Sequence, residues 1–135
     1  MKEVLIQTLQ GKKAERTPWV PFVGVHGGYL IGENARSYLR SDETLYKGLR
    51  EAIIRYQPDG IPIVFDLQLE AEILGCDLRW AADGPPCVIS HPLENRSFER
   101  LPLPTARSGR IPLIMKTVDR LKACLLYTSP SPRDS

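Results

Sequence analysis

The chain has 135 residues, 42% of them hydrophobic, which is the composition of one globular domain or of part of one. Its 18 basic and 16 acidic residues leave a net charge of +2 spread along the sequence, which excludes the basic patch of a nucleic-acid-binding protein. No apolar run approaches the ~20 residues that cross a bilayer, and the first residues lack a secretory cleavage site, so we expect a cytoplasmic protein.

The amino-terminal half is predicted to form a strand–helix–strand unit after a short leading helix. Residues 2–10 place apolar side chains on one helical face, and residues 19–25, WVPFVGV, are an apolar run that predicts a first inner strand. Residues 41–56 begin with a capping serine and continue with apolar residues at helical spacing. Residues 61–65, IPIVF, predict a second strand. Because such a crossover joins parallel strands, the two strands should lie side by side in an α/β fold.

The carboxyl-terminal half has a different pattern. Residues 67–74 suit a short helix, and the runs 77–80 and 87–90 on either side of a Gly/Pro-rich turn predict a β-hairpin. Residues 93–109 should be mostly irregular, and a further helix begins at Arg110.

An acidic corner behind the second predicted strand is the first candidate site. Asp66 stands at the carboxyl end of the run 61–65, where parallel sheets place their ligands. We expect Asp66 to project into an open pocket, with Glu70 as the next candidate and Glu72 on the helix surface. The alternative is that Asp66 only caps the helix that follows it.

A second candidate site follows the first predicted strand and consists of His26, Gly27, Gly28 and Tyr29. Adjacent glycines let backbone N–H groups approach a ligand closely, and His26 can serve as an acid, a base or a hydrogen-bond donor. The alternative for His26 is a loop histidine bonded to the backbone. The histidines and the three cysteines have no spacing typical of metal ligands, so no metal is assigned within this chain.

The last twelve residues, CLLYTSPSPRDS, are predicted to be a separate segment. Their Ser/Pro composition is typical of disorder, and the string resembles the conceptual translation of a transposon-derived sequencing adapter. We therefore expect residues 1–123 to be the native part of the domain and residues 124–135 to be a disordered, non-native tail. A genuine flexible terminus is the alternative.

Three stretches of the chain resemble the amino-terminal part of the uroporphyrinogen decarboxylase (URO-D) superfamily, which includes corrinoid-dependent methyltransferases. They read RTPWVPFVGVHGGY, GIPIVFDLQLEAEILGCDLRW and PPCVISHPL. The resemblance runs over essentially all of residues 1–123 and implies a (β/α)8 TIM barrel with its active site at the carboxyl face of the strands. Since such barrels take about 250 residues, it implies the amino-terminal third of a barrel that is incomplete in this chain.

The resemblance also implies roles for individual residues. Decarboxylases have an aspartate that binds pyrrole N–H groups nine positions before a glycine, and Asp66 stands nine positions before Gly75. They also carry a motif resembling MRQAGRY, whose arginines meet substrate carboxylates, whereas this chain has FVGVHGGY with both arginines missing. The implied catalytic residue is Asp66, and the implied substrate-binding residues are His26, Gly27, Gly28, Tyr29 and Glu70.

The segment Glu70-Ala71-Glu72, with Cys76 after it, looks more like the methyltransferase branch. That branch moves a methyl group between a corrinoid protein and a thiol, and its zinc ligands belong to a later part of the barrel. The leading expectation is therefore a methyltransferase-type enzyme that acts on a small molecule, a methylated corrinoid or thiol, with a corrinoid protein as partner and zinc only in a longer parent. The alternatives are a uroporphyrinogen decarboxylase of porphyrin biosynthesis, a catalytically inert fragment, and a non-enzymatic tetrapyrrole binder. Neither a nucleic acid nor a membrane is an expected partner.

Overall fold

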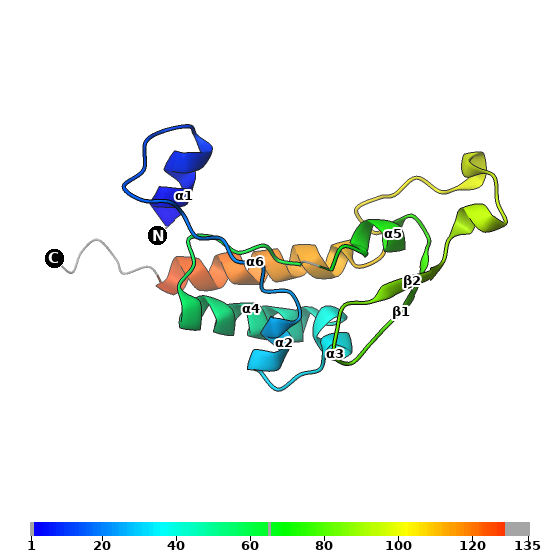
Figure 1. Cartoon of the computed structure of the whole chain (residues 1–135), viewed down its shortest axis with the longest axis horizontal. Coiled ribbons are helices and arrows are strands. Elements are labelled where there is room, and N and C mark those ends of the chain that lie inside the picture. Colours follow the sequence, from blue (N-terminus) through cyan, green and yellow to red (C-terminus); the bar gives the residue numbers. More distant parts are fainter. Residues whose placement is uncertain (1, 65, 129–135) are drawn as a thin grey trace.

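The computed structural model of the chain describes residues 2–64 and 66–128. In chain order the elements are α1 (Lys2–Leu9), α2 (His26–Leu30), α3 (Ala35–Leu39), α4 (Asp42–Tyr56), α5 (Leu69–Ile73), β1 (Asp77–Arg79), β2 (Cys87–Ser90), the 3₁₀ turns η1 (Pro92–Glu94) and η2 (Phe98–Arg100), and α6 (Ile111–Thr128). The long helices α4 and α6 lie side by side, and the β1–β2 hairpin with its two turns extends from one end of this pair (Figure 1).

The helix α4 forms where the sequence predicts it. The Ser41 hydroxyl accepts a hydrogen bond from the Thr44 N–H at 3.5 Å, and Gln57 ends the helix in a left-handed conformation with φ of 48°. The apolar face of α4 meets α6 and the segments before α2 and α5 in one core. The buried core residues are Val23, Tyr38, Leu39, Leu45, Leu49, Ala52 and Leu121.

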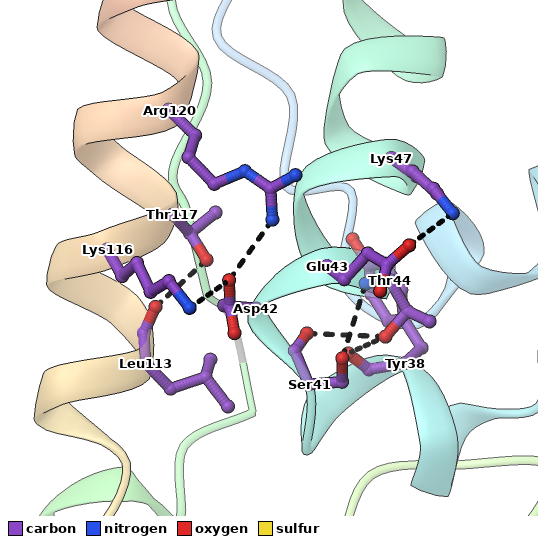
Figure 2. A network of polar contacts seen from close by, with 10 residues as sticks. All are labelled: Tyr38, Ser41, Asp42, Glu43, Thr44, Lys47, Leu113, Lys116, Thr117 and Arg120. Atoms are coloured by element: carbon purple, nitrogen blue, oxygen red, sulfur yellow. Dashed lines mark hydrogen bonds and ion pairs between the residues drawn. The ribbon is translucent and has the colours of Figure 1, made fainter.

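A carboxylate at the start of α4 joins it to α6. Asp42 Oδ2 lies 3.1 Å from Lys116 Nζ and 3.1 Å from Arg120 Nη1, as Figure 2 shows. Lys116, and after it Arg120, hold the pKa of Asp42 below its ordinary value. The Arg120 guanidinium also lies 4.5 Å from the centroid of the Tyr46 ring on α4. The two helices are therefore joined by charges outside the core as well as by apolar contacts within it.

We expect Asp42→Asn to lower the thermal midpoint at low ionic strength and to lower it much less in 1 M salt, where the Debye length is about 3 Å. The reason is that all three charged side chains are partly exposed, at 24%, 66% and 38% for Asp42, Lys116 and Arg120. Thermal unfolding at both salt concentrations measures the effect. Asp119→Asn, on the exposed side of α6, is the matched control. A deficit of equal size at both salt concentrations would contradict a charge-based contact.

The segment HGGY belongs to the helix α2, so its predicted place directly behind a strand is wrong. Gly27 and Gly28 are buried, and a Cβ atom added to Gly28 would lie 2.8 Å from Tyr38 Cβ. A Cβ atom on Gly48 of α4 would overlap the Gly27 carbonyl oxygen. The glycines let α2, Tyr38 and α4 approach each other closely, and this packing leaves the hydroxyl of Tyr38 buried without a hydrogen-bond partner among the described residues.

The prediction of two inner strands, at 19–25 and 61–65, is also wrong. Residues 19–25 and 61–64 form no strand, and Phe65 lies outside the described residues. Among the described residues, the sheet is the β-hairpin predicted further along the chain. In it β1 and β2 pair antiparallel, with Leu78 opposite Val88. Pro21 and Pro62 have no N–H to donate to a ladder, and parallel pairing is weaker per residue than antiparallel pairing. The apolar pattern still places residues of both segments against the core: Val23, Val25, Ile61, Ile63 and Val64.

One buried carboxylate connects the starts of these two segments. Arg16 Nη1 and Nη2 donate to Asp59 Oδ2 and Oδ1, each at 2.7 Å, and the Trp19 N–H donates to Oδ2 at 2.8 Å. The Asp59 side chain is 2% exposed. Arg16, and after it the Trp19 N–H, lower the pKa of Asp59 from 3.8 to about 2. The Asp59 N–H in turn donates to the Trp19 carbonyl at 2.9 Å.

We expect acid to weaken this connection. Because the pKa of Asp59 is lower in the folded chain, its contribution is complete above about pH 5 and is lost as the pH falls from 3.8 to about 2. Thermal midpoints of the wild type should fall over that range. Asp59→Asn should lower the midpoint at pH 6 and reduce the fall, whereas the exposed control Asp83→Asn should reproduce the wild-type profile. Parallel profiles for wild type and Asp59→Asn would contradict the prediction.

The last helix continues further than the sequence predicts. α6 ends at Thr128, so residues 124–128 of the predicted tail are helical and the expected disorder there is wrong. Residues 129–135 lie outside the described residues, and the adapter origin of the tail stays a prediction. None of the described helices has the length and apolarity that a bilayer span requires.

Candidate functional site

Asp66 is a buried residue and does not project into an open pocket as the sequence predicts. Its side chain is 0% exposed, and its Oδ2 lies 2.5 Å from Arg110 Nη2. Its Oδ1 accepts a hydrogen bond from the Gln68 N–H at 3.1 Å, two residues further along the chain. This local bond closes a turn before α5, but Asp66 is not the helix cap of the alternative, because the N-cap of α5 is Gln68 and no side chain caps it. The ion pair with Arg110 was not predicted.

Arg110 uses each part of its guanidinium group. Its Nε donates to Glu72 Oε2 at 2.7 Å, its Nη1 donates to the Leu39 carbonyl at 3.3 Å, and its side chain is 8% exposed. The guanidinium carbon lies 4.8 Å from the centroid of the Trp80 ring. A buried charge is tolerated when it is paired and hydrogen-bonded. Arg110 is paired with both carboxylates and hydrogen-bonded through Nε and Nη1, whereas its Nη2 and Asp66 Oδ2 form an ion pair without the geometry of a hydrogen bond. It joins the start of α6 to α3, α5 and the hairpin.

The two glutamates of α5 exchange the positions predicted for them. Glu72, expected on the helix surface, is the residue that pairs with Arg110 and is 21% exposed in its side chain. Glu70, the predicted pocket residue, is exposed. Residues two apart on a helix point to opposite sides, so only one of the two carboxylates can face Arg110. The identity of that carboxylate follows from the position of α6.

Leu67 turns the chain between Asp66 and α5 in a strained conformation. Its φ is +54°, in the left-handed region that favours glycine, and its side chain is among the exposed hydrophobic ones at 74%. Residues in this region that are not glycine cluster at functional sites, where the surrounding structure holds them. We call the segment from Asp66 to Glu70 the corner at Asp66. Both its conformation and its charge make it a candidate site.

His26 lies elsewhere and has a side-chain partner, which corrects the alternative of a histidine bonded to the backbone. Its Nε2 lies 2.8 Å from the hydroxyl of Tyr56, and its ring stacks on that of Tyr29 at 6.0 Å between centroids. Tyr29 is 79% exposed. These three residues form an exposed aromatic group. Tyr56 belongs to the apolar pattern of residues 41–56, which predicts a buried helix face and so gives no sign of a contact with His26.

The structure does not bring the two predicted sites together. The aromatic group reaches Tyr56 at the end of α4, while Arg110 binds Leu39, just before α4 begins. The 15 residues of α4 span about 21 Å at 1.5 Å per residue. Within residues 2–64 and 66–128, no three His, Cys, Asp or Glu side chains are grouped so as to hold a metal ion. These residues therefore do not fit a zinc site.

A family profile, a curated protein and a solved structure match the chain. The family profile described as "Uroporphyrinogen decarboxylase (URO-D)" matches residues 1–129. Over 58 residues the chain is 36% identical to the "Methylated-thiol--coenzyme M methyltransferase" of Methanosarcina mazei, a match that covers 43% of this chain and 16% of that protein. The solved structure of a "methyltransferase from Methanosarcina mazei" has a TM-score of 0.76 and 19% identity, over 96% of this chain and 39% of that one.

The chain thus spans well under half the length of these relatives. The structural match shows a shared fold, and the family and this fold are of the TIM-barrel type. Since the family profile covers nearly all of its residues, the chain belongs to the uroporphyrinogen decarboxylase family.

Proposed function

We propose that the chain supplies part of the substrate pocket of a methyl-transferring enzyme that acts in the cytoplasm. The observation that carries the proposal is the similarity to a relative named for methylated thiols and coenzyme M. The substrate class is a small methylated thiol or a methylated corrinoid, with a corrinoid protein as partner. The absence of both arginines from FVGVHGGY supports the same branch, because a substrate with many carboxylates needs bidentate partners.

The corner at Asp66 is the part of the pocket that this chain provides. A catalytic group must reach its substrate, and the Asp66 side chain has no exposed surface. Its role in this proposal is therefore to build the corner, whose exposed side chains are Leu67 and Glu70. Zinc and its ligands enter the proposal only through residues that this chain does not supply.

A second candidate function is the decarboxylation of uroporphyrinogen. It is favoured by the description of the matching family and by Asp66, which stands nine positions before Gly75 as in the decarboxylases. In that reaction a fixed anion stabilises positive charge on a pyrrole. The buried ion pair with Arg110 opposes direct contact between Asp66 and a pyrrole.

A chimera tests the two functions directly. Residues 1–123 would replace the matching segment of the Methanosarcina mazei methyltransferase, and the purified chimera would be given methylcobalamin with coenzyme M, or uroporphyrinogen. We expect loss of methylcobalamin absorbance and formation of methylated thiol, with no decarboxylated porphyrin. A chimera that melts cooperatively and transfers no methyl group, beside an active parent enzyme, would contradict the proposal. The 135-residue chain alone, in the same assays, tests the inert alternative.

A further inference from the structure

Leu67 carries backbone strain that its own packing does not offset. Its φ of +54° is unfavourable for a residue with a side chain, and at 74% exposure the leucine buries little apolar surface. Such a conformation persists only where surrounding contacts impose it. The contacts at this corner must therefore be stronger than the local preference of the chain.

Two contacts of Asp66 impose the conformation. Its Oδ1 accepts from the Gln68 N–H at 3.1 Å and so closes a turn over Leu67. Its Oδ2 meets Arg110 Nη2 at 2.5 Å. Arg110 is itself held by Glu72 at 2.7 Å, so a continuous series of polar contacts runs from the start of α6 to Leu67.

We infer that Arg110 is a positioning residue: through Asp66 it holds the corner that presents Leu67 and Glu70 to the substrate. The inference rests on the proposed function for what the corner faces, and on the contacts above for how the corner is held. Leu67 offers an apolar surface suited to a methylthio group, and Glu70, three residues further along the chain, offers an exposed carboxylate. Asp66 then acts through the corner and does not touch the substrate.

Nuclear magnetic resonance on the full chain, without any substrate, tests this role. A positive φ at Leu67 gives a strong intraresidue Hα–HN Overhauser effect, and the Asp66 bond protects the Gln68 amide from hydrogen exchange. Arg110→Met should remove the first signal from the folded chain and lower Gln68 protection at least about tenfold. Arg110→Lys should keep part of both, because lysine can pair with Asp66 alone.

The exposed residue Arg107 provides the control, since Arg107→Met should change neither signal. A Leu67 Overhauser effect that persists in folded Arg110→Met would overturn the inference, since a loss of global stability alone lowers protection at Gln68 and Leu49 together and leaves the folded conformation of Leu67 unchanged. If Arg110→Met does not fold, Glu72→Gln gives the same readout, with a partial loss expected at Gln68. Failure of methyl transfer in the chimera would overturn the proposed function and leave these spectra unaffected.

Discussion

Replacing Arg110 by methionine is expected to lower the free energy of unfolding by about 3–5 kcal/mol. Methionine roughly keeps the length of the side chain and removes its charge, so Asp66, at 0% exposure, and Glu72, at 21%, lose their cation. Since folded domains are stable by about 5–15 kcal/mol, the variant should retain only a small margin. Denaturation in urea, followed by circular dichroism, measures the loss.

The exposed Arg107 is again the matched control, and Arg107→Met should change the free energy of unfolding by less than about 0.5 kcal/mol. Adding Asp66→Asn and Glu72→Gln to Arg110→Met should restore part of the stability, because the penalty arises from carboxylates left without a cation. Similar losses in Arg110→Met and Arg107→Met would show that the buried cluster does not contribute to stability.

Gly48→Ala is expected to destabilise the chain by about 1–3 kcal/mol through overpacking. At an exposed helical position the same change would stabilise by about 1 kcal/mol, so the prediction concerns the sign as well as the size. The added methyl group would overlap the Gly27 carbonyl oxygen, and a backbone atom held in a helix cannot move aside easily. α2 would have to move away from α4.

Thermal unfolding compares this variant with Gly84→Ala, whose added methyl group would have no atom within 4 Å. The control should change the free energy of unfolding by less than about 0.5 kcal/mol. A higher thermal midpoint for Gly48→Ala would mean that α2 and α4 are not in contact through their glycines.

The elements that the sequence predicts correctly are those with local signals. Ser41 caps α4 through a bond to a residue three positions away, and the β-hairpin has turn residues between two short strands. The two predicted parallel strands would depend on hydrogen bonds to neighbouring strands that no local pattern specifies. Pro21 and Pro62 each remove one backbone N–H donor from their segment. Apolar content correctly predicted that part of each segment packs against the core, although Trp19 and Phe22 are exposed.

The sequence singles out Asp66 as a candidate, but it predicts neither the burial nor the partners of this residue. Asp66 and Arg110 are 44 positions apart in the sequence, so their pairing follows from the docking of α6 and not from spacing. One signal for it was present: a cation at the start of a helix is opposed by the helix dipole, so Arg110 before Ile111 indicates a carboxylate nearby. His26 and Tyr56, 30 positions apart, offer no comparable signal.

The buried phenol of Tyr38 sets an alkaline limit to the fold. Burial raises the pKa of Tyr38 above its ordinary value of 10.0, so the folded chain keeps this proton where the unfolded chain releases it. Above about pH 10 each further increase in pH therefore favours unfolding. The close packing of α2 on α4 thus makes the stability of the fold depend on pH in strong base through one hydroxyl group. That hydroxyl takes part in no hydrogen bond among the described residues.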